Sequence, residues 1–167
     1  MEKILISRCL LGENVRYDGG NSFCDHPVIK VWLKEKRLVA ICPEVTGGMP
    51  TPRLPSEIVG SGGGEAVLVN KATILNRAGL DVTALYVAGA HAALALAEQQ
   101  HIRMAILKAR SPSCGNNTIY DGSFSNIKIP GSGVTAALLQ EHQIHVFNET
   151  ELDAAAAYLA ELEHSIS

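Results

Sequence analysis

Residues 104–114 read M-A-I-L-K-A-R-S-P-S-C, an apolar run followed by a loop that ends in a cysteine. Two other stretches repeat this arrangement, because K-I-L-I-S-R precedes Cys9 and L-V-A-I precedes Cys42. Short apolar runs bounded by turn residues predict buried strands. The carboxyl ends of parallel strands converge on one crevice, where open α/β sheets bind ligands. The sequence therefore predicts that three thiols far apart along the chain meet in one place.

The segments between these strands carry the apolar spacing of helices. Helices are expected over 27–36, 81–100 and 134–141 and from about residue 150, and further strands over 66–70 and 144–147. Alternating strands and helices indicate a mostly parallel sheet covered on both faces. We therefore predict the fold class α/β, as a single-domain Rossmann-like three-layer sandwich over residues 1–167.

Helix ends and loops give finer expectations. Asp25 is the expected N-cap of the first helix, and Thr150 with Asp153 forms the expected capping box of the last. Four prolines and two glycines in residues 43–55 predict a shaped loop without regular structure. Residues 60–64, G-S-G-G-G, predict a softer loop. The longest helix has one apolar stripe, made of Val82, Leu85, Tyr86, Gly89, Ala93 and Leu96.

The composition bounds the class of protein. A chain of 167 residues with 47% hydrophobic side chains predicts one domain with a full core. A net charge of −3 with scattered Lys and Arg predicts no nucleic-acid partner. No apolar run reaches the ~18 residues of a membrane span, and the N-terminus lacks the pattern of a signal peptide. Four cysteines without an export signal predict a cytoplasmic protein whose thiols bind metal, do catalysis or fill the core.

Three converging thiolates at Cys9, Cys42 and Cys114 suit a soft metal centre. Structural zinc sites usually draw on close pairs such as C-x-x-C, which this chain lacks. Iron–sulfur clusters usually use four thiolates, so three would leave one iron open to bind substrate as a Lewis acid. Small buried hydrophobes remain the alternative for each cysteine. Cys24 lies in a loop before a helix, and we expect it to be structural or incidental.

Polar residues flank these cysteines. Glu44 follows Cys42 by two residues, so in an extended segment it would face the same pocket as a general acid or base. Arg53 would bind a carbonyl oxygen or an anion, or pair with Glu57. Ser111 and Ser113 precede Cys114, and either hydroxyl would hydrogen-bond substrate or relay a proton, or else stabilise a turn.

Other loop residues are candidates for the walls of the same crevice: Arg16, Tyr17, Asp18, Tyr120, Asp121 and Gly122. The sequence G-S-G at 131–133 opens a helix and would offer backbone N–H groups to an oxygen or phosphate, which is a common arrangement and a weak signal.

Taken together in chain order, these segments match a known pattern: 9–12 (C-L-L-G), 15–19 (V-R-Y-D-G), 42–45 (C-P-E-V), 47–53 (G-G-M-P-T-P-R), 79–83 (G-L-D-V-T), 106–108 (I-L-K), 111–115 (S-P-S-C-G) and 119–122 (I-Y-D-G). The chain resembles the small bacterial thiouracil desulfidase family, formerly a domain of unknown function. The match extends over nearly the whole chain. Many relatives carry a further cysteine where this chain has Val15, a departure that leaves the three proposed ligands intact, and Met49 replaces a more usual leucine.

The resemblance implies a [4Fe–4S] cluster held by Cys9, Cys42 and Cys114, with a fourth iron free to take the sulfur of a thiolated base. It also implies that Glu44 and a serine of the 111–113 loop assist proton transfer. The expected activity is non-redox desulfuration of 2- or 4-thiouracil, or of a related nucleoside or nucleotide, to uracil and hydrogen sulfide. Two alternatives stay open: an iron–sulfur sensor or sulfur-delivery protein without base turnover, and a thiol enzyme with Cys114 as nucleophile.

Overall fold

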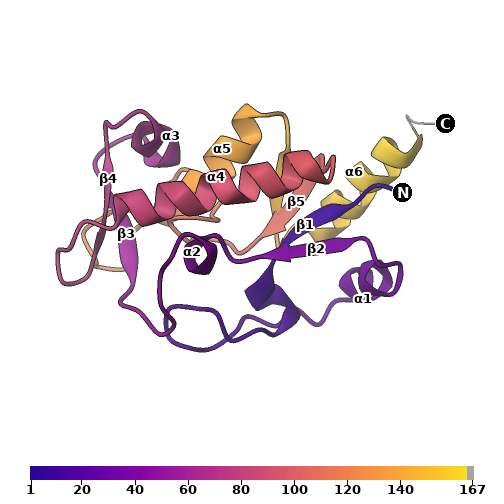
Figure 1. The fold of residues 1–167 in the computed structure, drawn as a ribbon, viewed down its shortest axis with the longest axis horizontal. Coiled ribbons are helices and arrows are strands. Elements are labelled where there is room, and N and C mark those ends of the chain that lie inside the picture. The colour runs from indigo at the N-terminus through magenta and orange to yellow at the C-terminus, as the bar shows by residue number, and fades with distance from the viewer. Residues whose placement is uncertain (165–167) are drawn as a thin grey trace.

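The computed structural model of the chain describes residues 1–164, so residues 165–167 of the expected domain lie outside the described part (Figure 1). Four parallel strands form the central sheet in the order β2-β1-β5-β8. Their bounds are Ile4–Ser7 (β1), Leu38–Ile41 (β2), Met104–Leu107 (β5) and His145–Asn148 (β8). Leu5 in β1 pairs with Val39 on one side and with Ala105 on the other. The predicted α/β class with a parallel sheet is confirmed.

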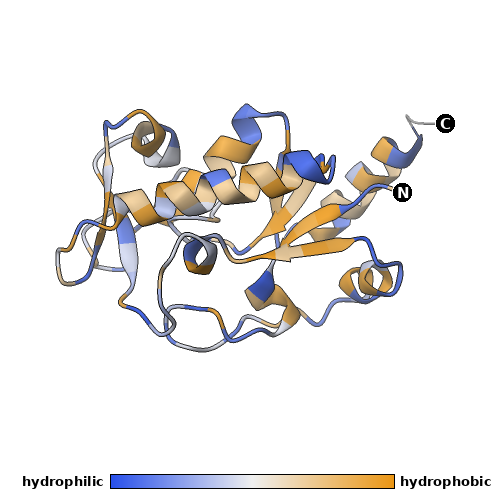
Figure 2. Cartoon of the chain, in the orientation of Figure 1, coloured by the Kyte–Doolittle hydropathy of each residue, from blue (hydrophilic) through white to orange (hydrophobic). Residues whose placement is uncertain are grey.

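Helices cover both faces of this sheet, which gives the predicted three layers. One face carries α1 (Pro27–Lys34) and α6 (Leu152–His164), and the other carries α4 (Thr83–Gln99) and α5 (Val134–Glu141). Alternate strand residues feed the two cores: Ile4 and Ile6 pack with Trp32 and Leu159, whereas Leu5 packs with Ala90 and Leu139. β1 and β5 are buried along their whole length and are largely apolar, as their orange colour in Figure 2 shows.

The longest helix, α4, touches a short helix, α2 (Pro43–Thr46), backbone to backbone. A Cβ on Gly89 would lie 2.0 Å from the Pro43 carbonyl oxygen, and one on Gly47 would lie 2.2 Å from the Leu85 carbonyl oxygen. Only glycine fits at both positions, so the two helices approach more closely than side chains would allow. This approach brings the first turn of α2 against the middle of α4.

Smaller elements lie beyond the carboxyl ends of the sheet strands (Figure 1). They are a 3₁₀ turn η1 (Arg8–Leu11), an antiparallel pair β3 (Ser56–Val59) and β4 (Thr73–Asn76), a helix α3 (Gly63–Leu68), and a hairpin β6 (Thr118–Tyr120) and β7 (Lys128–Pro130). None of the helices described in residues 1–164 combines the length and the apolar character of a membrane-spanning segment.

Two predictions of secondary structure were wrong. The strand expected over 66–70 belongs largely to α3, which packs so closely on α5 that a Cβ on Gly64 would lie 2.3 Å from the Gly133 carbonyl oxygen. A short apolar run does not distinguish strand from buried helix, and here tertiary packing decides. The segment 43–55 begins with the helical turn α2, because Pro43 occupies the first helical position, where proline is tolerated.

The predicted caps also differ from the structure. His26 caps α1 by accepting a hydrogen bond at Nδ1 from the Val28 N–H (3.1 Å), while Asp25 pairs with Lys30 instead. The last helix begins at Leu152, and Thr150 donates its hydroxyl to Asn148 rather than forming the capping box.

Candidate functional site

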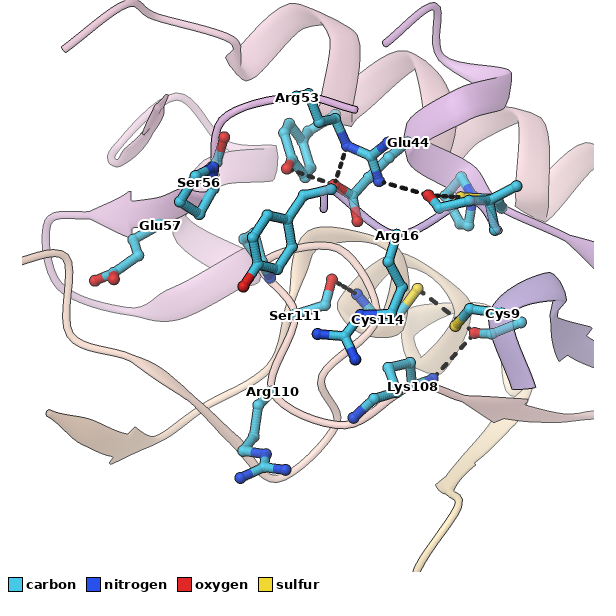
Figure 3. Close-up of a pocket in the computed structure, with 18 of the residues that line it drawn as sticks. Cys9, Arg16, Glu44, Arg53, Ser56, Glu57, Lys108, Arg110, Ser111 and Cys114 are labelled. Atoms are coloured by element: carbon cyan, nitrogen blue, oxygen red, sulfur yellow. Dashed lines mark hydrogen bonds and ion pairs between the residues drawn. The ribbon is translucent and has the colours of Figure 1, made fainter. Parts of the chain in front are cut away.

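A pocket of about 370 Å³ opens at the carboxyl ends of β1, β2 and β5, and Cys9, Cys42 and Cys114 all line it (Figure 3). Cys9 lies in η1 directly after β1, Cys42 directly follows β2, and Cys114 lies in the loop after β5. Figure 3 shows Cys9 and Cys114 pointing toward each other. The structure therefore brings together the three predicted thiols, whereas the half-buried Cys24 lies outside this pocket.

Burial disfavours the charged form of all three thiols. It raises the pKa of Cys9 to about 11 and also raises the pKa values of Cys42 and Cys114. The thiols lie close enough to affect one another, because negative charge on Cys42 raises the pKa of Cys9, and charge on either raises that of Cys114. Three thiolates in this pocket therefore need a compensating cation. Raised pKa values are also the opposite of what a cysteine nucleophile requires.

The donor set fits an iron–sulfur cluster. Three soft sulfur atoms surround one pocket, and iron–sulfur clusters are held by cysteine thiolates. Within residues 1–164, no group of three or more His, Cys, Asp or Glu side chains is arranged to hold a single metal ion. Cys114 is also held in place from β1, because the buried hydroxyl of Ser7 donates to its Sγ (3.8 Å) and accepts from the Lys108 N–H (3.0 Å).

Glu44 lies in the first turn of α2 and lines the same pocket as Cys42. The two were expected to face the pocket from an extended segment, but Cys42 precedes α2 as its N-cap and Glu44 is helical. One carboxylate oxygen, Oε1, accepts from the Tyr86 hydroxyl (2.6 Å) and from Arg53 Nε (3.2 Å). Figure 3 shows the carboxylate of Glu44 directed into the pocket. Oε1 is thus occupied, and Oε2 remains to act on a ligand.

Sequence reasoning placed Tyr86 on the apolar stripe of α4 and missed its polar role. Its side chain is buried, and burial together with the Glu44 charge raises the pKa of the phenol, which stays a hydrogen-bond donor. A buried tyrosine hydroxyl needs a partner, which is the one signal that pointed to this contact.

Arg53 pairs with Glu44 and not with Glu57. Its guanidinium also donates to the carbonyl oxygens of Val15 (3.0 Å) and Pro50 (3.1 Å), and its side chain is only 5% exposed. One arginine thereby joins the first loop, the proline-rich segment and the carboxylate, which gives the segment 43–55 its fixed shape.

The two candidate serines have different surroundings. Ser111 lines the pocket, and its Oγ accepts from the N–H groups of Ser113 (2.9 Å) and Cys114 (3.0 Å), so its own proton is available to a ligand. Ser113 is fully buried, and its Oγ lies 2.7 Å from the Thr135 hydroxyl.

The start of α5 supports the cysteine loop instead of a phosphate. The N–H groups of Gly133, Val134 and Thr135 donate to the carbonyl oxygens of Gly115, Pro112 and Ser113, at 2.7 to 2.8 Å. These are the N–H groups that the G-S-G sequence was expected to offer, and the backbone of the loop already uses them.

Basic and aromatic residues are prominent in the rest of the pocket wall. Of the six further candidates, Arg16, Tyr17 and Tyr120 line it, whereas Asp18, Asp121 and Gly122 do not. Sequence reasoning missed Arg77, Lys108, Arg110, Phe124 and Asn126. Lys108 pairs with Glu149 (2.8 Å). In the described part of the chain, the side chains of Arg77 and Arg110 form no ion pair. Arg77 follows β4, and Phe124 and Asn126 lie between β6 and β7, which are strands that the sequence analysis did not predict.

Comparisons with known proteins agree with this geometry. Residues 4–151 match the family model of 2-thiouracil desulfurase. The chain is 47% identical over 150 residues to YbbK of Bacillus subtilis (strain 168), covering 90% of this chain and 97% of YbbK. The solved structure of TudS, a [4Fe-4S]-dependent thiouracil desulfidase, is 43% identical with a TM-score of 0.87, covering 96% of this chain and 99% of that one. The chain therefore belongs to the 2-thiouracil desulfurase family.

Proposed function

We propose that the protein is a [4Fe–4S]-dependent enzyme that hydrolyses the C–S bond of a thiolated pyrimidine, such as 2- or 4-thiouracil, to give uracil and hydrogen sulfide. The observation that carries the proposal is the convergence of Cys9, Cys42 and Cys114 on one pocket beside Glu44. Family membership and the similarity to TudS support the same activity.

Cys9, Cys42 and Cys114 would hold the cluster, which accounts for all the thiols of the pocket. When bound, the cluster supplies an iron that lacks a protein thiolate and acts as a soft Lewis acid toward the sulfur of the substrate. The overall reaction consumes one water: a C–O bond forms, the C–S bond breaks, and no oxidation state of the pyrimidine carbon changes. The remaining task of the chain is to orient the ring and move protons.

Glu44 is the proposed general base. Tyr86 and Arg53 hold its Oε1, so Oε2 accepts the proton of the attacking water and returns it to the departing sulfur. Ser111 is the proposed hydrogen-bond donor, because its Oγ already accepts two N–H groups and its proton is free to bind water or the pyrimidine. We assign Ser113 a supporting role in the cysteine loop, since its buried hydroxyl lies 2.7 Å from the Thr135 hydroxyl and accepts from the Cys114 thiol (3.8 Å).

Two arginines in the pocket wall are relevant to whether the substrate carries a phosphate group. Arg77 and Arg110 line the pocket without ion pairs in the described chain, and arginine is well suited to bind phosphate. A thiolated nucleotide is therefore a candidate substrate beside the free base, and both belong in the assay. We place the enzyme in the cytoplasm, because all four cysteines are free and a reducing compartment keeps them so. We propose no nucleic-acid or membrane partner.

The test is anaerobic reconstitution followed by assay of uracil release. Wild-type protein should bind iron and acid-labile sulfide and release uracil and hydrosulfide over many turnovers. Cys9→Ala, Cys42→Ala and Cys114→Ala should each lose cluster and activity, while Cys24→Ala, the matched control, retains both. A full cluster without turnover on any thiolated pyrimidine would refute the enzyme proposal and favour the sensor or sulfur-delivery alternative. Activity in metal-free protein would favour a cysteine nucleophile.

A further inference from the structure

Seven non-glycine residues among the described ones have a positive φ, a conformation unfavourable to most side chains. Four of them directly follow the C-caps of helices, where left-handed residues commonly end a helix: Lys36, Asn70, His101 and Gln143. The other three are Arg110 (φ 71°), Phe124 (φ 58°) and Asn126 (φ 59°), and all three line the pocket. Among the described non-glycine residues, every positive φ that no helix end explains thus belongs to the site.

Phe124 is the least expected of these. Asparagine tolerates the left-handed region, but a bulky aromatic residue there is an outlier that the surroundings must hold in place. Strain of this kind persists where it serves binding or catalysis. The tip of the β6–β7 hairpin therefore has an unfavourable local conformation that its contacts must offset.

Glu57 holds this conformation. Its Oε1 accepts both the Gly122 N–H (2.9 Å) and the Phe124 N–H (3.2 Å). Gly122 lies so close to β3 that a Cβ on it would be 2.6 Å from the Ile58 carbonyl oxygen. Figure 3 shows the Glu57 carboxylate pointing away from Glu44 and Cys114. Glu57 therefore fixes the hairpin against β3 and takes no part in the chemistry.

The pocket is rich in aromatic side chains. Four of the eight Phe, Tyr and Trp residues of the chain line it: Tyr17, Tyr86, Tyr120 and Phe124. The phenol of Tyr86 is committed to Glu44, and Phe124 has no polar atom, so its ring contributes packing alone. Planar heteroaromatic bases stack on such rings.

We infer that Phe124 is a substrate-binding residue, whose ring packs against the pyrimidine ring of the substrate, and that Glu57 is the positioning residue that presents it. The identity of the ligand rests on the proposed function. The contact strengthens binding of substrate and product alike, so it acts on KM more than on kcat.

The experiment uses the reconstituted holoenzyme, with steady-state kinetics on 4-thiouracil and calorimetric titration with uracil. Phe124→Ala should raise KM and weaken uracil binding by about tenfold, with kcat changed by less than about threefold, as expected for loss of one stacking contact. Gln143→Ala removes a side chain from the same backbone conformation outside the pocket lining, and should leave KM, uracil affinity and iron content unchanged.

Two further variants test the positioning role. Glu57→Ala should reproduce the rise in KM. Glu57→Gln should recover most of the wild-type KM, because its amide oxygen still accepts the two N–H groups. The double variant Glu57→Ala with Phe124→Ala should have a KM no higher than that of Phe124→Ala alone. Additive effects of the double variant would overturn the positioning role. Unchanged KM and uracil affinity in Phe124→Ala would overturn the whole inference, as would a fall confined to kcat.

Failure of the proposed function is a separate result. If the proposed function fails, the wild-type holoenzyme releases no uracil, and the titration alone then decides the inference about Phe124. Uracil binding by wild type that is lost in Phe124→Ala would support the inference. No uracil binding by wild type would overturn it.

Discussion

Tyr86 and Glu44 are joined by a 2.6 Å hydrogen bond from the phenol to Oε1 of the carboxylate. The bond spans two helices, α4 and α2, whose backbones touch at Gly89 and Pro43. The same oxygen accepts from Arg53, so two fixed donors hold one side of the carboxylate and leave the other side to the pocket. This is how the packing of the fold presets the orientation of the proposed base.

Removing only the phenolic oxygen should therefore impair both catalysis and stability. We expect Tyr86→Phe to lower kcat by about tenfold, since a base held by one donor loses part of its alignment. KM and iron content should stay at wild-type values. The loss of one hydrogen bond to a charged group should reduce the free energy of unfolding by about 1.5–3 kcal/mol.

Tyr158→Phe is the matched control, because Tyr158 lies in an aromatic cluster with His145 and Phe147, outside the pocket. It should leave kcat unchanged. A wild-type kcat in Tyr86→Phe would show that Arg53 alone orients Glu44.

Gly89→Ala tests the contact that brings the two helices together. The added Cβ would lie 2.0 Å from the Pro43 carbonyl oxygen and 2.7 Å from the Pro43 carbonyl carbon, and a backbone neighbour cannot rotate away. We expect the free energy of unfolding to fall by about 1–3 kcal/mol, despite the better helix propensity of alanine, and kcat to fall because Glu44 moves with α2.

Denaturant unfolding and kinetics on the same preparation measure both effects. Gly20→Ala is the control, since the three atoms nearest to a Cβ there all belong to the side chain of Asp18, which can move, and stability should change by less than about 0.5 kcal/mol. Wild-type stability and rate in Gly89→Ala would mean that α2 shifts freely without disturbing the base.

The parts of the fold that the sequence predicts are those fixed by local pattern. The run at 104–107 is a strand whose residues are all buried, the run at 38–41 is an apolar strand at the edge of the same parallel sheet, and 134–141 is a helix with the predicted bounds. The convergence of the cysteines follows from the same pattern, since it needs only the rule that parallel strands end at one edge.

The parts that the sequence does not predict depend on contacts between distant segments. Residues 63–68 form α3 because Gly64 lies against the backbone of Gly133, a contact that no local period encodes. The bond from Tyr86 to Glu44 likewise spans 42 positions and two helices. Ser111 and Ser113 are equivalent in sequence, and only the burial of Ser113 against Thr135 distinguishes them.

These two serines should give opposite results when each is changed to alanine. Ser111→Ala should lower kcat by about tenfold or more at unchanged iron content, because it removes the one hydroxyl of the pair that lines the pocket. Ser113→Ala should leave kcat within about threefold but lower the free energy of unfolding by about 1–3 kcal/mol, since it leaves the buried Thr135 hydroxyl without its partner.

Kinetics below the unfolding transition and denaturant titration separate the two effects. The reverse outcome, in which Ser113→Ala abolishes turnover and Ser111→Ala does not, would show that the proton relay runs through the buried Ser113 and not through Ser111 in the pocket.

The loop that carries Cys114 is also tied to β8, through a carboxylate whose ionisation should make stability depend on pH. Glu151 accepts from the Asn116 side chain (2.9 Å) and from the Asn148 N–H (3.0 Å) at Oε1. Burial raises its pKa, but these hydrogen bonds outweigh burial, and the pKa of Glu151 lies below its ordinary value of 4.5. A depressed pKa in the folded state means that the ionised carboxylate stabilises the fold above the unfolded-state pKa, and that this contribution is lost as pH falls through the folded-state pKa.

Glu151→Gln keeps the shape and an acceptor oxygen but removes the charge. At pH 7 it should unfold with a free energy about 1 kcal/mol below wild type, and the difference should shrink as the pH falls below about 4. Urea titrations of both proteins at pH 7, 5 and 3.5 measure this convergence. A gap that stays constant down to pH 3.5 would mean that the amide disturbs the packing around Asn116 and Asn148, and that the charge of Glu151 contributes nothing to holding the loop.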